Sequence, residues 1–440
     1  MLSCARKRLQ ALGADQQRVV RALMHVSLFV LVGRMAGAAR EVAIAARYGA
    51  GAEVDAYVLV SGLVGWPVSV WTSVLSTVLL PLLVREAQAA GMARFRDELL
   101  GASLLLGLMV GLACAGALHF AIAGGHLALA PQIAAVALAI IPALALTAAI
   151  GVVLGFYSML LMAGGSHLNT LLEGAAPLTA LAAVLLIPGG GIVSLVGGTL
   201  AGLVLQLALS AVLQPARPPP WPRLSFQARV WTPFTRGVAI VVAGQVVISA
   251  TGAADQLMVA GLGVSANATL DYANRLIALA MSVGAVVVAR SMLPVFAGIG
   301  DRSRTLRLAG GWSAALFTAG AAGVIVAWPL APWAVQLLFE RGAFTAADTA
   351  AVAGALRTGL LQVPPFLAGM VMVQLLASRS AYTAFLLLGL LGFVVKVGLN
   401  LVLIPRLGVA GAMAASAGMY LVNVVVLHVI AYSPDRTRAA

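Results

Sequence analysis

Residues 130–162 read APQIAAVALAIIPALALTAAIGVVLGFYSMLLM, a stretch without a single Asp, Glu, Lys or Arg. A helix crosses the hydrocarbon core of a bilayer with about 20 apolar residues, so this stretch is long enough to span a membrane. The whole chain has the same character, because 62% of its 440 residues are hydrophobic and only 9% are charged. Soluble domains are about 25% charged, so too few polar residues remain here to cover a globule. The composition therefore predicts an integral membrane protein.

Other apolar stretches give a total of about twelve transmembrane helices, arranged as two halves of six. The expected spans are 20–47, 54–84, 99–123, 130–162, 167–188 and 190–213, followed by 232–262, 266–298, 305–331, 348–377, 381–404 and 407–432. The fold class is thus an all-α polytopic membrane protein with two six-helix lobes. The first span lacks a small-residue cleavage site, so it is read as a helix and not as a signal peptide.

A proline-rich segment from Pro215 to Arg223 separates the two halves and cannot be helical. The predicted domains are a tail at 1–19, an N-lobe at 20–213, a linker at 214–231, a C-lobe at 232–432 and a second tail at 433–440.

The distribution of positive charge predicts the topology of these helices. The net charge of +13 does not form one patch with interleaved aromatic residues, so we exclude nucleic acid as a partner. Of the 27 Lys and Arg residues, 19 lie on the side that carries both termini, and three (Arg47, Arg341 and Arg406) lie on the other. Positive residues collect on the cytoplasmic side of membrane proteins. Both termini and the linker are therefore expected to be cytoplasmic, in a multi-pass protein of the bacterial inner membrane.

The two halves also repeat each other in sequence. Ile187-Pro188 precedes Gly191, and Ile404-Pro405 precedes Gly408 at an offset of 217 residues. Each half has an even number of helices, so the repeats share one orientation and are related by an axis along the membrane normal. Transporters that work by alternating access use this arrangement, with the substrate bound between the lobes near the midplane. A duplication can also be purely structural.

Several charged residues lie inside the expected spans, where each costs at least about 2.5–3.5 kcal/mol at a helix centre. Arg34 and Arg40 belong to the first span and Arg275 to the eighth, one helix from each half. If these helices face each other, the cavity between the lobes is cationic and suits a pyrophosphate, which guanidinium groups bind bidentately. Alternatively, Arg34 and Arg40 pair with Glu41 and Asp55 as structural staples, or reach a membrane interface.

A second group of charges belongs to the C-terminal half. By helix order, Lys396 in the eleventh span is expected to pair with Asp255 in the seventh. The pair is either an ion- or proton-coupling device or a buried structural salt bridge. Gly33, Gly37 and the Pro364-Pro365 pair predict bent spans.

No grouping of residues indicates an enzyme. The five histidines are scattered without metal-ligand spacing, and the two cysteines, Cys4 and Cys114, suit neither a disulfide nor a metal site. Nucleophile elbows, phosphate-binding glycine loops and paired acidic motifs are also missing from the sequence. A membrane-embedded glycosyl- or acyltransferase is therefore a distant alternative. The prediction is a transporter without metal or soluble cofactor.

Three blocks of sequence stand out along the chain. The first block is Gly33-Arg34-Met-Ala-Gly37-Ala-Ala-Arg40-Glu41 with Tyr48-Gly49-Ala-Gly51 and Asp55-Ala56-Tyr57. The second is Asp255-Gln256 with Tyr272-Ala273-Asn274-Arg275-Leu276 and Leu293-Pro294. The third is Leu338-Phe339-Glu340-Arg341-Gly342-Ala343-Phe344-Thr345 with Asp348-Thr349. Together they cover nearly the whole chain in one order, and they resemble the MurJ/MviN lipid-flippase family of the multidrug/oligosaccharidyl-lipid/polysaccharide exporter superfamily.

The resemblance implies a flippase that moves an undecaprenyl-pyrophosphate-linked saccharide from the cytoplasmic to the periplasmic leaflet. Lipid II, the peptidoglycan precursor, is the first choice of cargo. It also implies that Arg34, Arg40, Asp55 and Arg275 contact this substrate. The position of a further family arginine on the second helix falls near Val68, and an extra helix pair of the family has no counterpart here. An exopolysaccharide or O-antigen unit flippase, or a non-transporting scaffold that binds the lipid carrier, therefore stays open.

The resemblance also bears on coupling. Some members resemble sodium-coupled carriers with a cation site formed by the seventh, eleventh and twelfth helices. Asp255, Asn400 and Ser416 correspond to that site, and Lys396 stands where a neutral ligand is expected. The hypothesis is that the lysine ammonium replaces the cation. A coupling cation and the membrane potential both stay open as driving forces. The expected partners are the lipid-linked saccharide and membrane lipids, and the expected state is a monomer.

Overall fold

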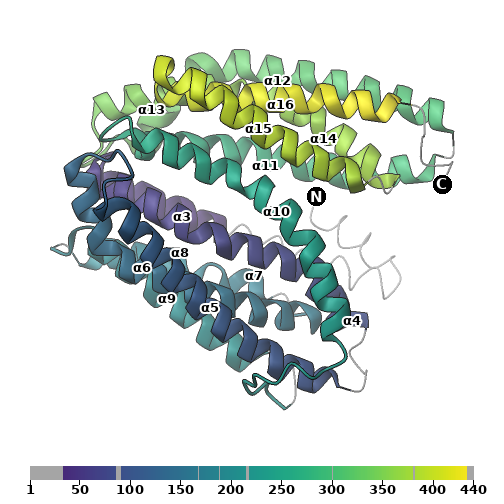
Figure 1. Ribbon diagram of the computed structural model, residues 1–440. Coiled ribbons are helices and arrows are strands. Elements are labelled where there is room, and N and C mark those ends of the chain that lie inside the picture. The colour runs from purple at the N-terminus through teal and green to yellow at the C-terminus, as the bar shows by residue number, and fades with distance from the viewer. Residues whose placement is uncertain are drawn as a thin grey trace, which may run out of the picture. The chain divides into compact units, whose positions relative to one another are not determined.

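The computed structural model describes residues 33–85, 91–166, 168–187, 189–214, 218–299, 301–379 and 382–433. Helices make up most of these ranges, and no strand occurs in them (Figure 1). The predicted tail at 1–19, residues 20–32 of the first span and most of the second tail lie outside the described residues. The all-α fold predicted from the apolar stretches is confirmed.

The helices follow the predicted spans closely. Residues 33–48 are helical, and the helices after them are α3 (Ala52–Val74), the short π-helix η1 (Leu75–Leu79), α4 (Leu80–Arg85), α5 (Met92–Ala123), α6 (Pro131–Ala163), α7 (Leu168–Leu172), α8 (Ala175–Leu186), α9 (Gly191–Leu213), α10 (Trp231–Ala260), α11 (Ala266–Gly298), α12 (Arg302–Phe339), α13 (Ala346–Leu360), α14 (Val363–Ser378), α15 (Tyr382–Leu407) and α16 (Val409–Tyr432).

Ten helical stretches within the described ranges are long and apolar enough to cross a membrane. They correspond to ten of the twelve predicted spans. The eighth predicted span is the 33-residue helix α11, which is not one of the ten. Only part of the first predicted span belongs to the described residues. The polytopic class is therefore confirmed, and the count of twelve stays a prediction.

Two of the spans are broken helices. The tenth predicted span divides into α13 and α14, because the helix ends at Leu360 and starts again at Val363, next to Pro364 and Pro365. Proline lacks a backbone N–H and fits the first turn of a new helix, which explains the restart. The fifth span divides into α7 and α8 near Glu173, where Gly174 precedes α8 and Pro177 lies in the first turn of that helix. Asn169 donates a hydrogen bond to the Glu173 carboxylate at this break (3.0 Å).

The chain packs as two compact units whose boundaries fall inside helices. Unit 1 contains residues 1–44, 67–117 and 140–241, and unit 2 contains residues 45–66, 118–139 and 242–440. The predicted division into lobes at 20–213 and 232–432 stays a prediction.

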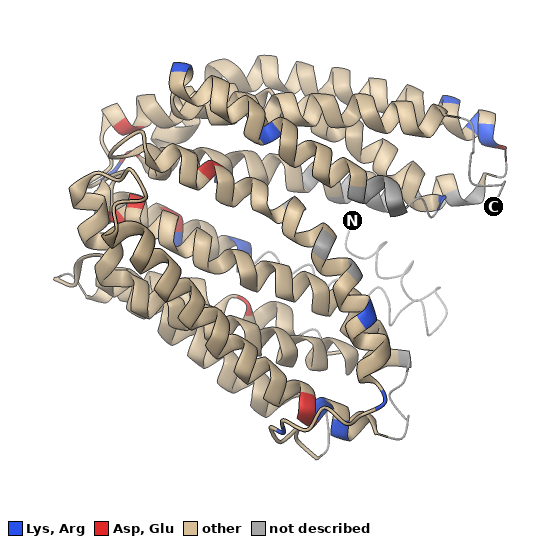
Figure 2. Cartoon of the chain, in the orientation of Figure 1, with Lys and Arg blue, Asp and Glu red and all other residues tan. Residues whose placement is uncertain are grey.

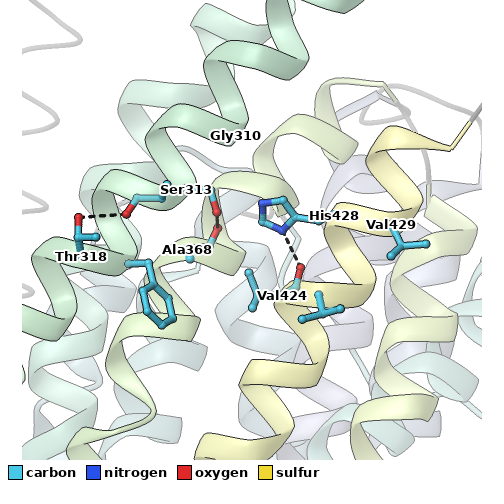
Figure 3. A pocket seen from close by; sticks show the side chains of 10 residues that line it. Gly310, Ser313, Thr318, Ala368, Val424, His428 and Val429 are labelled. Carbon is cyan, nitrogen blue, oxygen red and sulfur yellow. Dashed lines mark hydrogen bonds between the residues drawn. The ribbon is translucent and has the colours of Figure 1, made fainter.

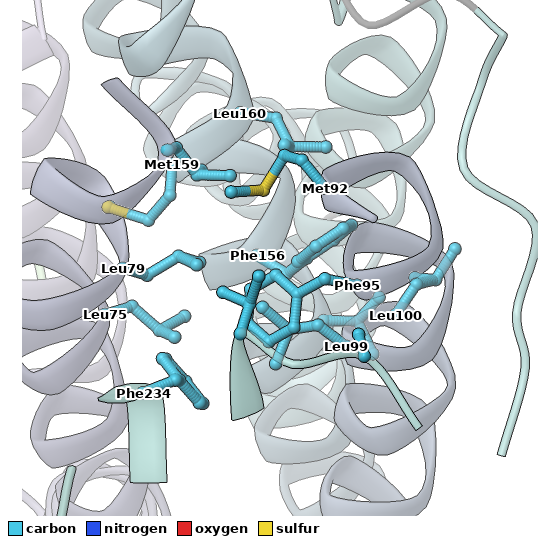
Figure 4. Packing of buried hydrophobic residues seen from close by; sticks show 14 residues of the cluster. Leu75, Leu79, Met92, Phe95, Leu99, Leu100, Phe156, Met159, Leu160 and Phe234 are labelled. Atoms are coloured by element: carbon cyan, nitrogen blue, oxygen red, sulfur yellow. The ribbon is translucent and has the colours of Figure 1, made fainter. Parts of the chain in front are cut away.

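Each unit has its own apolar core. In unit 1, the rings of Phe95, Phe156 and Phe234 lie among leucines and methionines of η1, α5 and α6 (Figure 4). In unit 2, α14 contributes Val371, Met372 and Leu375 to a core that also contains residues of α11, α12 and α16. Helix α15 packs on α16, and α12 packs on α14 (Figure 1).

Charged side chains are rare along the helices. Figure 2 shows most of the ribbon in tan, with the charged residues gathered mainly near helix ends and a few inside helices. The exterior of the spans is instead apolar: Leu112, Ile325, Val326 and Leu401 are each at least 62% exposed. Exposed aliphatic surface of this kind suits lipid and not water.

Candidate functional site

The three sequence blocks that carry the family resemblance meet in unit 2. Segments 46–55, 265–272 and 339–345 come together there, and we call this assembly the motif junction. By the topology predicted above, all three segments lie at the periplasmic ends of their helices. The motif junction therefore joins the start of the second span to the loops before the eighth and tenth spans.

Asp55 is the buried centre of this junction, with no solvent exposure. Its carboxylate accepts hydrogen bonds from the backbone N–H groups of Ser265 and Ala268, the latter at 2.7 Å. Ser265 is the N-cap residue of α11 and Ala268 lies in its first turn, where backbone N–H groups have no partner within the helix. A negative charge is favourable at this end of a helix. Asp55 therefore caps α11 from another helix, which is a positioning role.

Further hydrogen bonds join the segments of the junction, and the close approach of two backbone segments requires a glycine. Ala343 N donates to the carbonyl oxygen of Ala46 (2.7 Å), and the Tyr272 hydroxyl donates to the carbonyl of Gly49 (3.0 Å). Gly342 has a φ of +62°, and a Cβ at this residue would lie 2.0 Å from the Ala46 carbonyl oxygen. The same contact explains the glycine in the third sequence block, since any larger residue would separate the two segments.

An aromatic group supports the junction from one side. The Tyr272 ring lies 5.0 Å from the Phe339 ring and 5.4 Å from the Phe344 ring, measured between centroids. Tyr272 is 1% exposed. The residues of the third block thus serve interhelix packing in this state.

The three predicted cavity arginines are divided between the units. Arg34 and Arg40 belong to unit 1, and Arg275 belongs to unit 2. Arg34 is exposed, whereas Arg40 is half-buried and forms an ion pair with Glu41 (2.5 Å). The structure thus contains the Arg40–Glu41 pair of the staple alternative.

Arg275 has an acidic neighbour of its own on α11. Its Nε donates to the Asp271 carboxylate one helical turn away (2.6 Å), and both side chains are partly exposed. This contact fixes the Nε edge of the guanidinium group. A role of the three arginines in binding substrate stays a prediction.

Four further predicted residues come together inside unit 2. Lys396 Nζ lies 3.0 Å from Asp255 Oδ2, and it donates to the Ser416 hydroxyl at 2.5 Å. Asn400 Nδ2 donates to the other oxygen of Asp255 at 2.7 Å. The four residues come from α10, α15 and α16, the helices that the sequence assigned to the seventh, eleventh and twelfth spans. Lys396 is 2% exposed, so the ion pair is buried.

One charged site was missed by the sequence reasoning. Glu98 at the start of α5 has no solvent exposure, and its carboxylate holds the linker that precedes α10. It accepts hydrogen bonds from the backbone N–H groups of Gln227 (3.1 Å) and Ala228 (3.0 Å). It also accepts from the side chains of Arg94 (3.0 Å), Ser225 (2.5 Å) and Trp231 (2.7 Å).

The linker is therefore not a free spacer in this structure. The Trp231 ring packs on Phe95 with 5.2 Å between centroids, one turn from Glu98. Asp97 adds a contact to the backbone N–H of Trp221 (2.9 Å). A local signal for this site is the acidic pair Asp97-Glu98 directly after Arg94 and Arg96, near the start of α5.

A separate pocket of about 490 Å³ lies among α12, α14 and α16 of unit 2 (Figure 3). Its polar groups are bonded within the protein: the Ser313 hydroxyl donates to the carbonyl of Ala368 (3.1 Å), and His428 Nδ1 lies 2.7 Å from the carbonyl oxygen of Val424. The pocket therefore presents mainly apolar surface. Among the residues that the structure describes, no group of three or more His, Cys, Asp or Glu could hold a metal ion.

Comparison with known families identifies the chain. A family model described as "Lipid II flippase MurJ" matches residues 44–437, which include almost all of the described helices. The chain belongs to the lipid II flippase MurJ family. The MurJ family consists of transporters and not of enzymes, in agreement with the sequence prediction. A comparison with curated proteins finds no match.

Solved structures agree with the MurJ fold. A structure of lipid II flippase MurJ in an inward closed conformation is similar with a TM-score of 0.81 and 16% identity, and the match covers 93% of this chain and 88% of that one. An inward-facing multidrug resistance MATE family transporter of the MOP superfamily gives a TM-score of 0.67, 16% identity and coverage of 91% and 93%. A MOP superfamily transporter from Pyrococcus furiosus gives a TM-score of 0.62 and 15% identity, and the match covers 93% of this chain and 94% of that one. These likenesses establish the fold.

Proposed function

We propose that this chain moves lipid II from the cytoplasmic to the periplasmic leaflet of the bacterial inner membrane by alternating access. The family match over residues 44–437 is the observation that carries the proposal. The transporting unit is a monomer with both termini in the cytoplasm. Its cargo is an undecaprenyl-pyrophosphate-linked saccharide, and no soluble cofactor takes part.

The charge of the cargo fits the predicted arginines. A pyrophosphate presents several acceptor oxygens, and guanidinium groups bind such oxygens with two parallel hydrogen bonds. Arg34, Arg40 and Arg275 are proposed to hold this group. Glu41 and Asp271 would hold the guanidinium groups of Arg40 and Arg275 in place, because each carboxylate already accepts a hydrogen bond from its arginine. A cationic cavity also responds to the membrane potential, at about 2.3 kcal/mol per charge and 100 mV.

The motif junction is proposed to be the periplasmic gate of this cycle. Its contacts at Asp55, Tyr272 and Gly342 tie residues 46–55, where the first predicted span ends and the second begins, to the start of α11 and to the loop before α13. Release of a headgroup to the periplasm requires these contacts to separate. Asp55 would thus act on transport through the gate, by holding the first turn of α11.

Complementation tests the proposal directly. The chain is expressed in a bacterium depleted of its own lipid II flippase, beside Arg34→Ala, Arg275→Ala and the control Arg406→Ala. Arg406 is exposed at the end of α15 and is not a proposed substrate contact. We expect growth with the unmodified chain and the control, and loss of growth with the other two variants at equal membrane abundance.

The remaining outcomes separate the alternatives. Failure of the unmodified chain to restore growth, with the protein present in the membrane, would contradict lipid II as cargo and favour a polysaccharide-unit flippase. Binding of lipid II by the purified chain without translocation in vesicles would favour a scaffold. Growth that survives both arginine substitutions would remove the proposed pyrophosphate site while leaving lipid II transport intact.

A further inference from the structure

The Lys396 ammonium lies in a buried cage of oxygen atoms. A lysine ammonium has three N–H donors and no acceptor. Here it has three acceptors: the carbonyl oxygen of Ala412 (2.7 Å), the Ser416 hydroxyl (2.5 Å) and Asp255 Oδ2 (3.0 Å). Donors and acceptors therefore match in number, and the side chain is 2% exposed. Oxygen atoms of the protein therefore satisfy all three donors of this ammonium group.

The three oxygens differ in kind. They are a backbone carbonyl, a hydroxyl and a carboxylate, and oxygens of these kinds replace the hydration shell of a hard cation in proteins. A fourth oxygen belongs to the same group, since Asn400 is fully buried and its Oδ1 has no hydrogen-bond partner among the described residues. The Asn400 Nδ2 orients the Asp255 carboxylate from the other side. These oxygen atoms are therefore of the kinds that form a monovalent cation site. The positive charge among them belongs to the Lys396 side chain, so it is covalently attached to the protein.

The charge balance decides what the cage can hold. Asp255 and Lys396 together are neutral, so an additional metal ion would leave one positive charge uncompensated in a buried place. Without the ammonium, the carboxylate alone would need a cation. The residues present therefore do not fit the sodium ion that the resemblance implies, because the ammonium lies among its oxygen ligands.

We propose that Lys396 is a tethered cation that occupies an alkali-metal site permanently, and that shortening this side chain uncovers a working sodium site. One consequence follows. The unmodified chain does not bind sodium at this place. The inference concerns the ion and is independent of the identity of the cargo.

Thermal unfolding of the purified, detergent-solubilised full chain tests the inference. Tm is measured in NaCl, KCl and N-methyl-D-glucamine chloride at equal ionic strength, for the unmodified chain, Lys396→Ala and the double variant Lys396→Ala/Asp255→Asn. We expect the unmodified chain to give one Tm in all three salts. Lys396→Ala should have a lower Tm in N-methyl-D-glucamine chloride and recover it in NaCl with a saturable dependence. The double variant should show no such recovery, because the carboxylate charge is gone.

A small ammonium ion provides an independent readout. Methylammonium chloride should raise the Tm of Lys396→Ala and leave that of the unmodified chain unchanged, because the ion can enter only where the tether has been removed. If Lys396→Ala does not accumulate, Lys396→Asn, which supplies a short neutral oxygen ligand, is measured by the same criteria.

Two results would overturn the inference. Saturable stabilisation of the unmodified chain by sodium, lost on Asp255→Asn, would place a sodium ion beside the lysine. The other is a folded Lys396→Ala or Lys396→Asn protein that has the same Tm in sodium, methylammonium and N-methyl-D-glucamine. Lys396 would then form only a structural salt bridge. Neither result depends on a flipping assay, so failure of the lipid II proposal would be recognised separately.

Discussion

Substitution of Gly342 by alanine should open the motif junction. Gly342 has a φ of +62°, and an added Cβ would lie 2.0 Å from the Ala46 carbonyl oxygen, a backbone atom that cannot rotate away. The left-handed backbone costs a residue with a Cβ about 1–2 kcal/mol. The steric overlap adds about 1–3 kcal/mol, the typical cost of inserting a carbon into a packed place. Only the cost of the steric overlap disappears when the junction separates. This cost therefore shifts the equilibrium between the closed and open forms of the junction toward the open form.

Gly125 provides a matched control for this substitution. Its φ is +70°, and an added Cβ would meet no atom within 4 Å. Gly125→Ala therefore carries the backbone cost without the overlap. The difference between the two variants isolates the contact with Ala46. A difference of 1–3 kcal/mol corresponds to about a 5–150-fold change in the ratio of open to closed forms.

Cysteine accessibility measures that ratio. A single reporter cysteine replaces Ala50, which is 3% exposed inside the junction segment, in a background without Cys4 and Cys114. A membrane-impermeant maleimide is applied to intact cells from the periplasmic side. We expect Gly342→Ala to raise the labelling rate about 5–150-fold and Gly125→Ala to leave it close to the parent. Equal labelling of both variants would refute the view that this glycine contact keeps the gate closed.

Three further predictions follow from buried charges. Asp55→Asn should lower the Tm, because one backbone N–H at the start of α11 would face an amide N–H₂ and the free energy of unfolding would fall by about 1–3 kcal/mol. The neighbouring Glu53→Gln is the control. An unchanged Tm for Asp55→Asn would contradict its capping role. Glu98→Gln should speed tryptic cleavage of the linker, since each lost charge-assisted hydrogen bond costs about 1.5–3 kcal/mol. Asp97→Asn should have a smaller effect, and equal cleavage rates for the two variants would argue against the role of Glu98 in holding the linker. Lys396→Met should destabilise the chain by about 3–5 kcal/mol, and the loss of stability should be smaller when Asp255→Leu is added. A double variant that is less stable than the single variant would contradict a charge pair between Lys396 and Asp255.

The helices could be predicted because their determinants are local. A span needs only a sufficient apolar length, and the break before Val363 needs only Pro364 and Pro365. The Asp255–Lys396 ion pair also had a sequence signal, since two opposite charges stood in spans of the same half. The break near Glu173 was not predicted, although Gly174 and Pro177 at the start of α8 are a signal of the same kind.

The contacts of Asp55 and Glu98 could not be read from the sequence. The resemblance implied a substrate role for Asp55, yet its oxygens accept from residues about 210 positions away, at Ser265 and Ala268. The sequence predicted no role for Glu98, and its partners Gln227 and Ala228 lie in the segment predicted to be a linker. Backbone N–H groups carry no sequence signature. A carboxylate that binds them looks the same in sequence as one that binds cargo or water.

The pairing of Asp255 with Lys396 has a consequence for how the protein is made. The two residues are 141 positions apart, so at about 5–20 residues per second the lysine is synthesised roughly 7–28 s after the aspartate. During that interval α10 carries a carboxylate without its partner, five residues before the end of the helix, and an unpaired charge within a span is costly. Helix α10 should therefore stay beside the insertion machinery or in a hydrated place until α15 arrives. The second half of the protein is expected to assemble in one late step, when the lysine reaches the aspartate.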